Sequence, residues 1–83
     1  MVYYVYMLKS ISDKKNKSYV GYTNNLSLRI FKHNSNTGAK STKGYKWILI
    51  YKKKFNSKSA AMSFEFKLKK DRTKRKKILK SIK

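Results

Sequence analysis

The sequence predicts an α/β fold, in which a small three-stranded central sheet is flanked by helices in the order β-β-α-β-α, followed by a basic C-terminal helix. Apolar stretches rich in aromatic and β-branched residues at 2–8 and 45–55, and a shorter β-like stretch around Gly21, predict the strands. Two segments of helical periodicity after polar capping residues predict the helices. We find no repeat and no domain boundary, and therefore expect one domain over residues 1–83, with 71–83 as a basic helix or tail.

The first strand is expected over residues 2–8, as a buried central strand, because this stretch is apolar throughout. A polar loop over residues 9–17 separates it from a second strand over residues 18–23, so the two should form a hairpin. The third strand is expected within residues 45–55. Its apolar run at residues 47–51 (WILIY) predicts burial on both faces.

The first helix is expected over residues 26–34, because Asn24 and Asn25 are good N-caps and a loop over residues 35–44 follows. Asn56 or Ser57 should cap a second helix that runs to about residue 70. The predicted apolar face of that helix consists of Ala60, Ala61, Phe64 and Leu68. In the tail helix, the predicted anchoring residues are Ile78, Leu79 and Ile82.

The charge of the chain is strongly unbalanced. Its 83 residues include 23 Lys and Arg against three Asp and Glu, for a formal net charge of +20. A lysine bias from an AT-rich genome would raise the lysine count but does not explain the near absence of acidic residues. Such a charge favours a polyanionic partner, with nucleic acid first and an anionic membrane surface second.

Several classes of protein are excluded or disfavoured. With no cysteine, disulfides and thiolate zinc sites are excluded, so a metal would bind through oxygen or through His33, the single histidine. The apolar runs are far shorter than the ~20 residues of a membrane span. No phosphate-binding glycine loop and no cluster of paired carboxylates is present. We expect an intracellular, cytoplasmic protein, with association with the nucleoid as an alternative, and no small-molecule substrate.

The residues able to support phosphodiester chemistry are two tyrosines, an arginine, a histidine and one glutamate. Tyr6 lies on the first predicted strand and Tyr19 on the second. Arg29 and His33 are four residues apart and should share one face of the first helix. Glu65 is the only glutamate of the chain and lies at the border of the apolar face of the second helix.

The order and spacing of these segments resemble the GIY-YIG endonuclease family, and most closely its small stand-alone bacterial-type (UPF0213-like) members. Residues 3–8 (YYVYML) resemble the opening strand, and residues 18–26 (SYVGYTNNL) resemble the second motif and the helix start. Residues 33–34, 38–40 and 42–44 match the following loop, and residues 55–68 match the helix that carries the family's metal-binding glutamate. Each fragment alone is weak, but their order together is specific.

Two positions depart from the motif letters. Tyr4 stands where the motif has glycine, and Val20 replaces the isoleucine of YIG. Valine keeps a β-branched core residue. We expect the side chain of Tyr4 to point away from the neighbours of Tyr6, so that the site is unharmed. No cysteine-rich zinc module follows, unlike in the eukaryotic junction resolvases with this domain.

The resemblance implies a metal-dependent endonuclease, with DNA a more favoured substrate than RNA. Glu65 would hold one divalent cation, Mg²⁺ or Mn²⁺. Tyr6 or Tyr19 would act as the general base or position the water, with a pKa that nearby cations lower. Arg29 would stabilise charge on the phosphate and His33 would hydrogen-bond or shuttle a proton. Phosphate contacts are expected from Lys40, Lys43, Lys69, Lys70, Arg72 and Arg75.

Other interpretations of the same residues stay open at this point. Strand tyrosines are commonly core residues, a helical arginine is commonly solvated, and Glu65 could merely neutralise Lys69. The run at residues 74–77 could be a solvated face. The chain could be a nucleic-acid-binding module with weak or no activity on the same fold, or a basic structural protein. The oligomeric state is open, with a monomer as the default.

Overall fold

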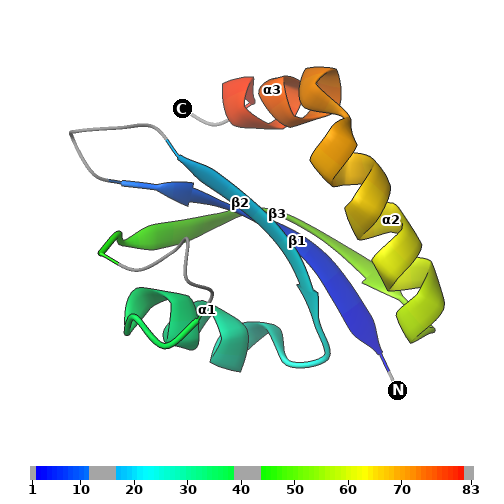
Figure 1. The fold of residues 1–83 in the computed structure, drawn as a ribbon, viewed down its shortest axis with the longest axis horizontal. Helices are drawn as coiled ribbons and strands as arrows, with labels where there is room; N and C mark the ends of the chain where they lie inside the picture. The colour runs from blue at the N-terminus through cyan, green and yellow to red at the C-terminus, as the bar shows by residue number, and fades with distance from the viewer. Residues whose placement is uncertain (1, 12–16, 39–43, 82–83) are drawn as a thin grey trace.

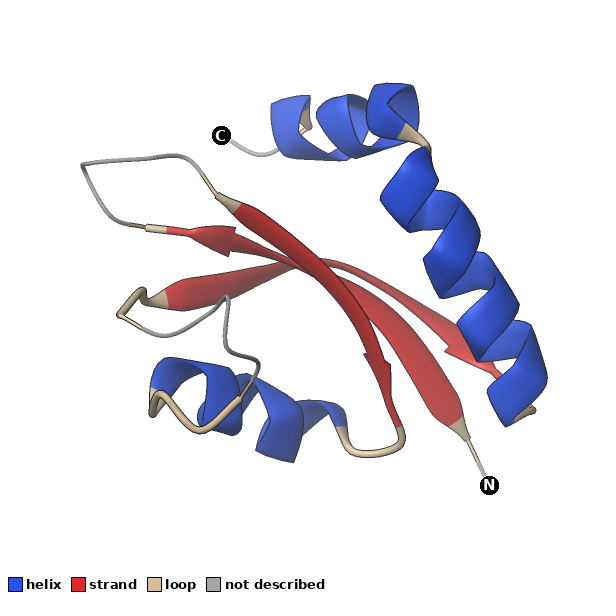
Figure 2. Ribbon diagram, viewed as in Figure 1, coloured by secondary structure: helices blue, strands red, loops and turns tan. Residues whose placement is uncertain are grey.

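The computed structural model describes residues 2–11, 17–38 and 44–81. The elements are β1 (Tyr3–Ser10), β2 (Ser18–Thr23), α1 (Leu26–Asn34), β3 (Trp47–Phe55), α2 (Lys58–Lys70) and α3 (Arg72–Lys80). This order confirms the predicted fold class. The sheet lies between two helical layers, with α1 on one face and α2 with α3 on the other (Figures 1 and 2).

The sheet has the strand order β2-β1-β3, and both pairings are antiparallel. The central position of β1 explains its continuous apolar sequence, because both of its faces are covered. β1 runs to Ser10, two residues beyond the prediction. There Ser10 closes the hairpin: its backbone N–H donates to the Lys17 carbonyl at 2.9 Å, and its hydroxyl accepts from the Lys17 N–H at 3.0 Å.

Side-chain alternation along β1 divides the core into two clusters, one on each face of the sheet. On the α1 side, the buried residues are Tyr6, Leu8 and Trp47, with Leu26 and Ile30 of α1 packed against them. On the α2 side, the buried residues are Val5, Met7, Val20, Ala61 and Leu68. Tyr6 therefore lies on the face that α1 covers.

Two polar contacts fix α1 in place. At its start, the Asn25 side chain accepts the Leu28 N–H at 3.2 Å, which confirms one of the two predicted caps. At its end, Asn34 clamps the first residue of β3: its amide nitrogen donates to the Trp47 carbonyl at 3.1 Å, and its amide oxygen accepts from the Trp47 N–H at 2.6 Å. These contacts hold the helix that carries Arg29 and His33 at both ends.

The helices α2 and α3 are capped by Ser57 and Asp71, whose side chains accept N–H bonds from Ala60 and Lys74. α2 packs through Ala61 and Leu68, whereas Ala60 is exposed, so its predicted place on the apolar face was wrong. No helix in the described part of the chain is long and apolar enough to cross a membrane.

The α3 helix packs on the sheet through the half-buried side chains of Ile78 and Leu79, as predicted for the tail. The third predicted anchor, Ile82, lies outside the described residues.

Two expectations about the strands were wrong. β3 is an edge strand rather than one buried on both faces: Trp47 is buried, but Ile48 is 40% exposed, and Lys52 to Lys54 are exposed as well. Tyr4 does not point away from the neighbours of Tyr6. The two tyrosines are two residues apart on a regular part of β1, so their side chains lie on the same face.

Candidate active site

The centre of the candidate site is the hydroxyl group of Tyr6, a side chain with no exposed surface on the central strand. Its oxygen lies 2.9 Å from Nε2 of His33 and accepts a hydrogen bond from Nε of Arg29 at 3.2 Å. Both partners come from the same face of α1, as their spacing of four residues predicts. The fold thus brings together three of the five predicted catalytic residues around one oxygen atom.

The donors and acceptors at this oxygen determine where the protons lie. A guanidinium only donates, so the Tyr6 oxygen must accept from Arg29. The Tyr6 hydroxyl can then donate its proton to Nε2 of His33 in the tautomer that leaves this nitrogen unprotonated. Burial, together with the charge of Arg29, lowers the pKa of His33 to about 4, so the imidazole is neutral at neutral pH. In that tautomer His33 is a hydrogen-bond acceptor for the phenol.

The pKa of Tyr6 differs from the expectation. Burial raises it to about 12, because the phenolate loses its hydration. The hydrogen bond and the positive charge of Arg29 act in the opposite direction, but they do not offset the burial. We predicted that nearby cations lower this pKa. For Tyr6 the net shift is upward, so the prediction was wrong in direction. At neutral pH the group is a phenol.

Tyr19 joins the same cluster from the neighbouring strand β2. Its ring centroid lies 4.8 Å from that of His33 and 6.3 Å from that of Tyr6, in tilted arrangements. The pKa of Arg29 is raised, first by its hydrogen bond to Tyr6 and to a lesser extent by Tyr19. Both predicted tyrosines therefore lie within reach of the same guanidinium.

Gly21 provides the space that the Tyr6 hydroxyl occupies. It is the cross-strand partner of Tyr6, and a Cβ at this position would lie 2.6 Å from the Tyr6 oxygen and 3.0 Å from the ring of Tyr19. Only the absence of a side chain lets the phenol lie across β2, which is an edge strand. The hydroxyl is thereby placed toward the β2 edge of the sheet.

Glu65 comes from the opposite helical layer. On α2 it is four residues from Ala61 and three from Leu68, so it borders the buried stripe. The neighbouring Phe64 packs on Phe55 of β3 with ring centroids 5.2 Å apart, which places Glu65 on the other border, toward β2. Its negative charge contributes to the raised pKa of Tyr6, so the carboxylate lies within electrostatic range of the phenol.

The Glu65 carboxylate fits a ligand of a divalent cation. Its side chain is 18% exposed, and the Lys69 ammonium lies 3.7 Å from a carboxylate oxygen, too far for a hydrogen bond. Among the described residues, no group of three His, Cys, Asp or Glu side chains could hold a metal. A single carboxylate suits Mg²⁺, which keeps several waters and takes phosphate oxygens as further ligands.

Comparison with known proteins identifies the family of the chain. The family model described as the GIY-YIG catalytic domain matches residues 2–78. The chain belongs to the GIY-YIG family. This family consists of endonucleases, so the domain is of a nuclease type.

Its similarity to UPF0213 proteins covers most of the chain. A UPF0213 protein of Staphylococcus haemolyticus is 44% identical over 68 residues, which are 81% of this chain and 79% of the relative. One from Oceanobacillus iheyensis is 41% identical over 68 residues, with 81% and 76% covered. The solution NMR structure of the UPF0213 protein BH0048 from Bacillus halodurans superposes with a TM-score of 0.54 at 35% identity, covering 99% of this chain and 86% of that one.

The predicted phosphate-binding residues of this GIY-YIG domain are dispersed. Lys69 lies near Glu65. The ammonium of Lys70 instead lies 4.4 Å from the ring centroid of the exposed Phe66, on the outer side of α2. Arg72 is exposed on α3. Arg75 is half-buried, and its Nε is buried with no hydrogen-bond partner. Lys40 and Lys43 lie outside the described residues.

Sequence reasoning missed a polar hollow beside Arg29. It measures about 180 Å³ and is lined by Thr23, Asn24, Asn25, Leu28, Arg29 and Lys32. The residues before α1 were noted only as helix caps. A capping residue that is followed by cations four and seven positions later is a sequence signal for such a hollow. Gly38 was also missed as a support of the site: a Cβ there would lie 2.6 Å from Nδ1 of His33.

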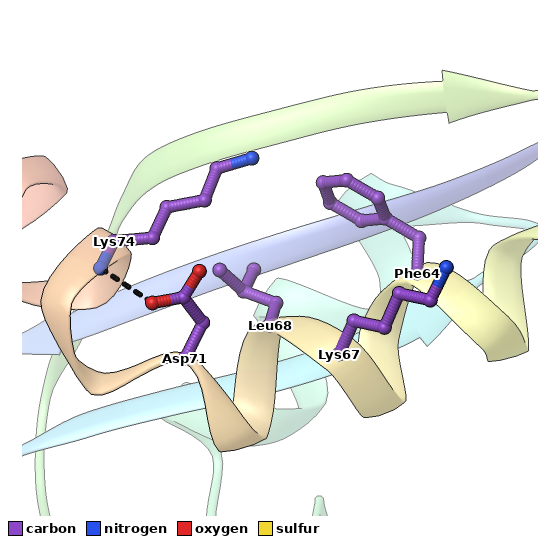
Figure 3. Close-up of a pocket in the computed structure, with 5 residues that line it drawn as sticks. All are labelled: Phe64, Lys67, Leu68, Asp71 and Lys74. Carbon is purple, nitrogen blue, oxygen red and sulfur yellow. Dashed lines mark hydrogen bonds between the residues drawn. The ribbon is translucent and has the colours of Figure 1, made fainter.

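A second hollow lies away from this chemistry. It measures about 190 Å³ and lies between α2 and α3, where it is lined by the apolar Phe64 and Leu68 and by the charged Lys67, Asp71 and Lys74 (Figure 3). The Asp71 carboxylate, drawn bonded to the Lys74 N–H, caps α3 there. Because Phe64 and Glu65 lie on opposite borders of α2, this hollow does not belong to the Tyr6 cluster.

The buried His33 makes the stability of the GIY-YIG domain dependent on pH. Its pKa in the folded state, about 4, is below the ordinary value of 6.5, so the unfolded chain binds the proton more readily. Stability is therefore complete above the ordinary pKa and is lost as pH falls toward 4. We expect the free energy of unfolding to fall by about 2 kcal/mol between about pH 7 and pH 5, measured by urea denaturation.

The control for this effect is His33→Gln, which removes the only histidine of the chain. The variant should show a nearly flat stability between the same two pH values, because no other side chain has an ordinary pKa in that interval. An equal loss of stability in both proteins would contradict the assignment of a buried, neutral His33.

Proposed function

We propose that this protein is a metal-dependent endonuclease that hydrolyses phosphodiester bonds of nucleic acid, with DNA preferred over RNA. The observation that carries the proposal is the Tyr6 hydroxyl, which is bound by Arg29 and His33 and is within electrostatic range of Glu65. A base, a cation and a carboxylate at one place are what phosphodiester hydrolysis requires. The monomeric state and the cytoplasmic location stay predictions.

Arg29 would hold the scissile phosphate. Its Nε donates to Tyr6, and the planar guanidinium carries further N–H groups in a geometry that matches two phosphate oxygens. The side chain also lines the polar hollow at the start of α1, so one face of the guanidinium is accessible to a ligand. The charge that builds on the phosphate in the transition state is then met by a fixed cation.

Tyr6 and His33 would move the proton of the attacking water. The water oxygen forms its bond to phosphorus while its proton passes to the Tyr6 oxygen, the phenol proton passes to Nε2 of His33, and the histidine, whose pKa is about 4, releases that proton to solvent and returns to its neutral form. The bond from phosphorus to the leaving oxygen breaks, and that oxygen takes a proton from solvent. This relay needs no preformed phenolate, so the raised pKa of Tyr6 is compatible with its role as the base.

Glu65 would hold the divalent cation, Mg²⁺ or Mn²⁺, through its carboxylate oxygens. When bound, such a cation neutralises charge on the phosphate and favours its attack by water. Lys69 lies 3.7 Å from this carboxylate and would turn toward a neighbouring phosphate when the cation is held. Tyr19 would position the water beside Tyr6, as its ring packs on the same histidine.

A cleavage panel tests this proposal. The protein is incubated with supercoiled plasmid, a branched DNA and a structured RNA, each with Mg²⁺, with Mn²⁺ and with a chelator. We expect cleavage of DNA with either cation and none with the chelator. Salt-sensitive binding without cleavage of any substrate would contradict the proposal and favour the alternative, a nucleic-acid-binding module on the same fold.

A further inference from the structure

Three successive lysines at the end of β3 divide between the two faces of the sheet. The register pairs Tyr6 with Lys52 and Tyr4 with Lys54, so these two lysines share the face of Tyr6. Lys53 lies on the opposite face, where its ammonium is 5.0 Å from the ring of Phe64 and 5.9 Å from that of Phe55. All three are exposed, but only two of them can contact a ligand on the Tyr6 face.

The Tyr6 face carries two rows of neighbouring side chains across the three strands. One row is Gly21, Tyr6 and Lys52, and the next is Thr23, Tyr4 and Lys54. Successive rows on one face are roughly 6.6 Å apart, because a strand rises about 3.3 Å per residue. The second row lies nearer the N-terminal end of β1.

The second row also connects with the polar hollow at the start of α1. Thr23, the cross-strand partner of Tyr4, lines that hollow together with Arg29 and Lys32. Cationic groups therefore lie near Tyr4 on two elements: Arg29 and Lys32 on α1, at the hollow that Thr23 also lines, and Lys52 and Lys54 on β3. Tyr4 itself belongs to neither core cluster.

The α1 helix leaves this end of the face uncovered. Its apolar side chains pack on the cluster formed by Tyr6, Leu8 and Trp47, to which Tyr4 does not belong. In Figure 1, the first part of β1 and the last part of β3 extend beyond α1. The rows that carry Tyr4, Lys52 and Lys54 are thus accessible beside the candidate active site.

We propose that Lys52 and Lys54 bind the backbone phosphates next to the scissile bond, so that the nucleic-acid strand crosses the sheet face from Arg29 over Tyr4 to β3. This inference rests on the proposed function, because it takes the Tyr6 and Arg29 site as the point of cleavage. Lysine on a flexible stem binds phosphate as a point charge and adds affinity without sequence preference. Tyr4, which stands at the motif's glycine position, provides an aromatic surface along this path.

The competing explanation is that the lysines protect an edge strand. Exposed lysines on an edge strand prevent pairing with another chain, and β3 is such a strand. That explanation treats all three lysines alike, because protection of an edge does not depend on which face a side chain lies on. The proposed path distinguishes Lys52 and Lys54 from Lys53, and this difference can be measured.

The test compares the salt dependence of DNA binding in three variants. Lys52→Gln, Lys54→Gln and the matched control Lys53→Gln each remove one charge from the same exposed segment. Binding to a labelled duplex is followed by fluorescence anisotropy over a series of salt concentrations, with a chelator to prevent cleavage. We expect the slope of log K against log salt to fall by about 0.9 for each of the first two variants and to change little for the control.

The outcomes separate this inference from the proposed function. Equal slopes for all three variants would overturn the path, whether or not the wild-type protein cuts DNA. If the slopes differ as expected but the wild-type protein cuts no substrate, the surface stands as a binding surface and the nuclease proposal falls. If the path is correct and the protein is active, the Lys53→Gln variant should cleave subsaturating DNA at the wild-type rate, whereas Lys52→Gln and Lys54→Gln should cleave it more slowly.

Discussion

Replacement of Glu65 by glutamine is expected to lower the rate of DNA cleavage by at least about 10³-fold. A bound cation supplies several kcal/mol of charge stabilisation in the transition state, and each ~1.4 kcal/mol is a factor of ten in rate. Glutamine has nearly the shape of glutamate, but its neutral amide is a poor ligand for Mg²⁺. The measurement is the single-turnover cleavage rate of a labelled duplex at saturating Mg²⁺.

The matched control for Glu65→Gln is Asp71→Asn. It removes the same charge at the end of the same helix, and asparagine caps a helix as well as aspartate does. Asp71 lies at the hollow on the other border of α2. The Asp71→Asn variant should therefore cleave DNA at a rate within a few-fold of the wild-type rate. Equal losses of activity in both variants would contradict a specific role for Glu65, because they would indicate an effect of net charge alone.

Replacement of Tyr6 by phenylalanine is expected to lower the rate of cleavage by about 10²–10⁴-fold, the usual contribution of a general base. The change also deprives Arg29 and His33 of a shared partner. We therefore expect a loss of stability of about 1–3 kcal/mol. Cleavage rates are compared with thermal unfolding of the same samples, so that activity is measured well below the melting temperature.

Tyr4→Phe is the control for Tyr6→Phe, since it removes the same group two residues away on the same face of β1. Tyr4 keeps its ring in this variant, so both stability and cleavage should remain close to those of the wild-type protein. Comparable cleavage by Tyr6→Phe and the wild-type protein would eliminate the Tyr6 hydroxyl as the base and leave Tyr19 as the candidate.

Local signals in the sequence were sufficient to predict the elements of the fold. The caps at Asn25 and Ser57 satisfy free N–H groups of their own helices, so their positions depend on a few neighbouring residues only. The same holds for the shared face of Arg29 and His33, which follows from the helical repeat. The expected bounds of β2 and α1 agree with the structure for this reason.

The errors concern properties that depend on the neighbours of a residue in space. The apolar run in β3 resembles that of a buried strand, but nothing in the run shows that β1 occupies the centre of the sheet. The pKa of Tyr6 depends on the balance between burial, which raises it, and the contact with Arg29, which lowers it. These two residues are 23 positions apart in the chain. The error about Tyr4 is different, since alternation along a strand was enough to place it on the face of Tyr6.

The candidate site could be predicted as a set of residues, and their roles stay predictions. The family resemblance implied Tyr6, Arg29 and Glu65, whereas the hydrogen bonds at the Tyr6 oxygen depend on the packing of α1 on the sheet and could not be predicted. The proposed role of Lys52 and Lys54 could not be inferred from the sequence. Alternation along a strand separates them from Lys53, but only the register with β1 shows that they share the face of Tyr6.

Paramagnetic broadening by Mn²⁺ is the most direct test of whether Glu65, Tyr6 and Arg29 act on one phosphate. NMR spectra of the 9.9 kDa protein are recorded with a non-hydrolysable DNA analogue while Mn²⁺ is added in small amounts. We expect selective broadening at Gly21, at the Arg29 side chain and around Glu65, and loss of this broadening in Glu65→Gln. Broadening confined to α2 in the wild-type protein, without any at Gly21 or Arg29, would contradict it.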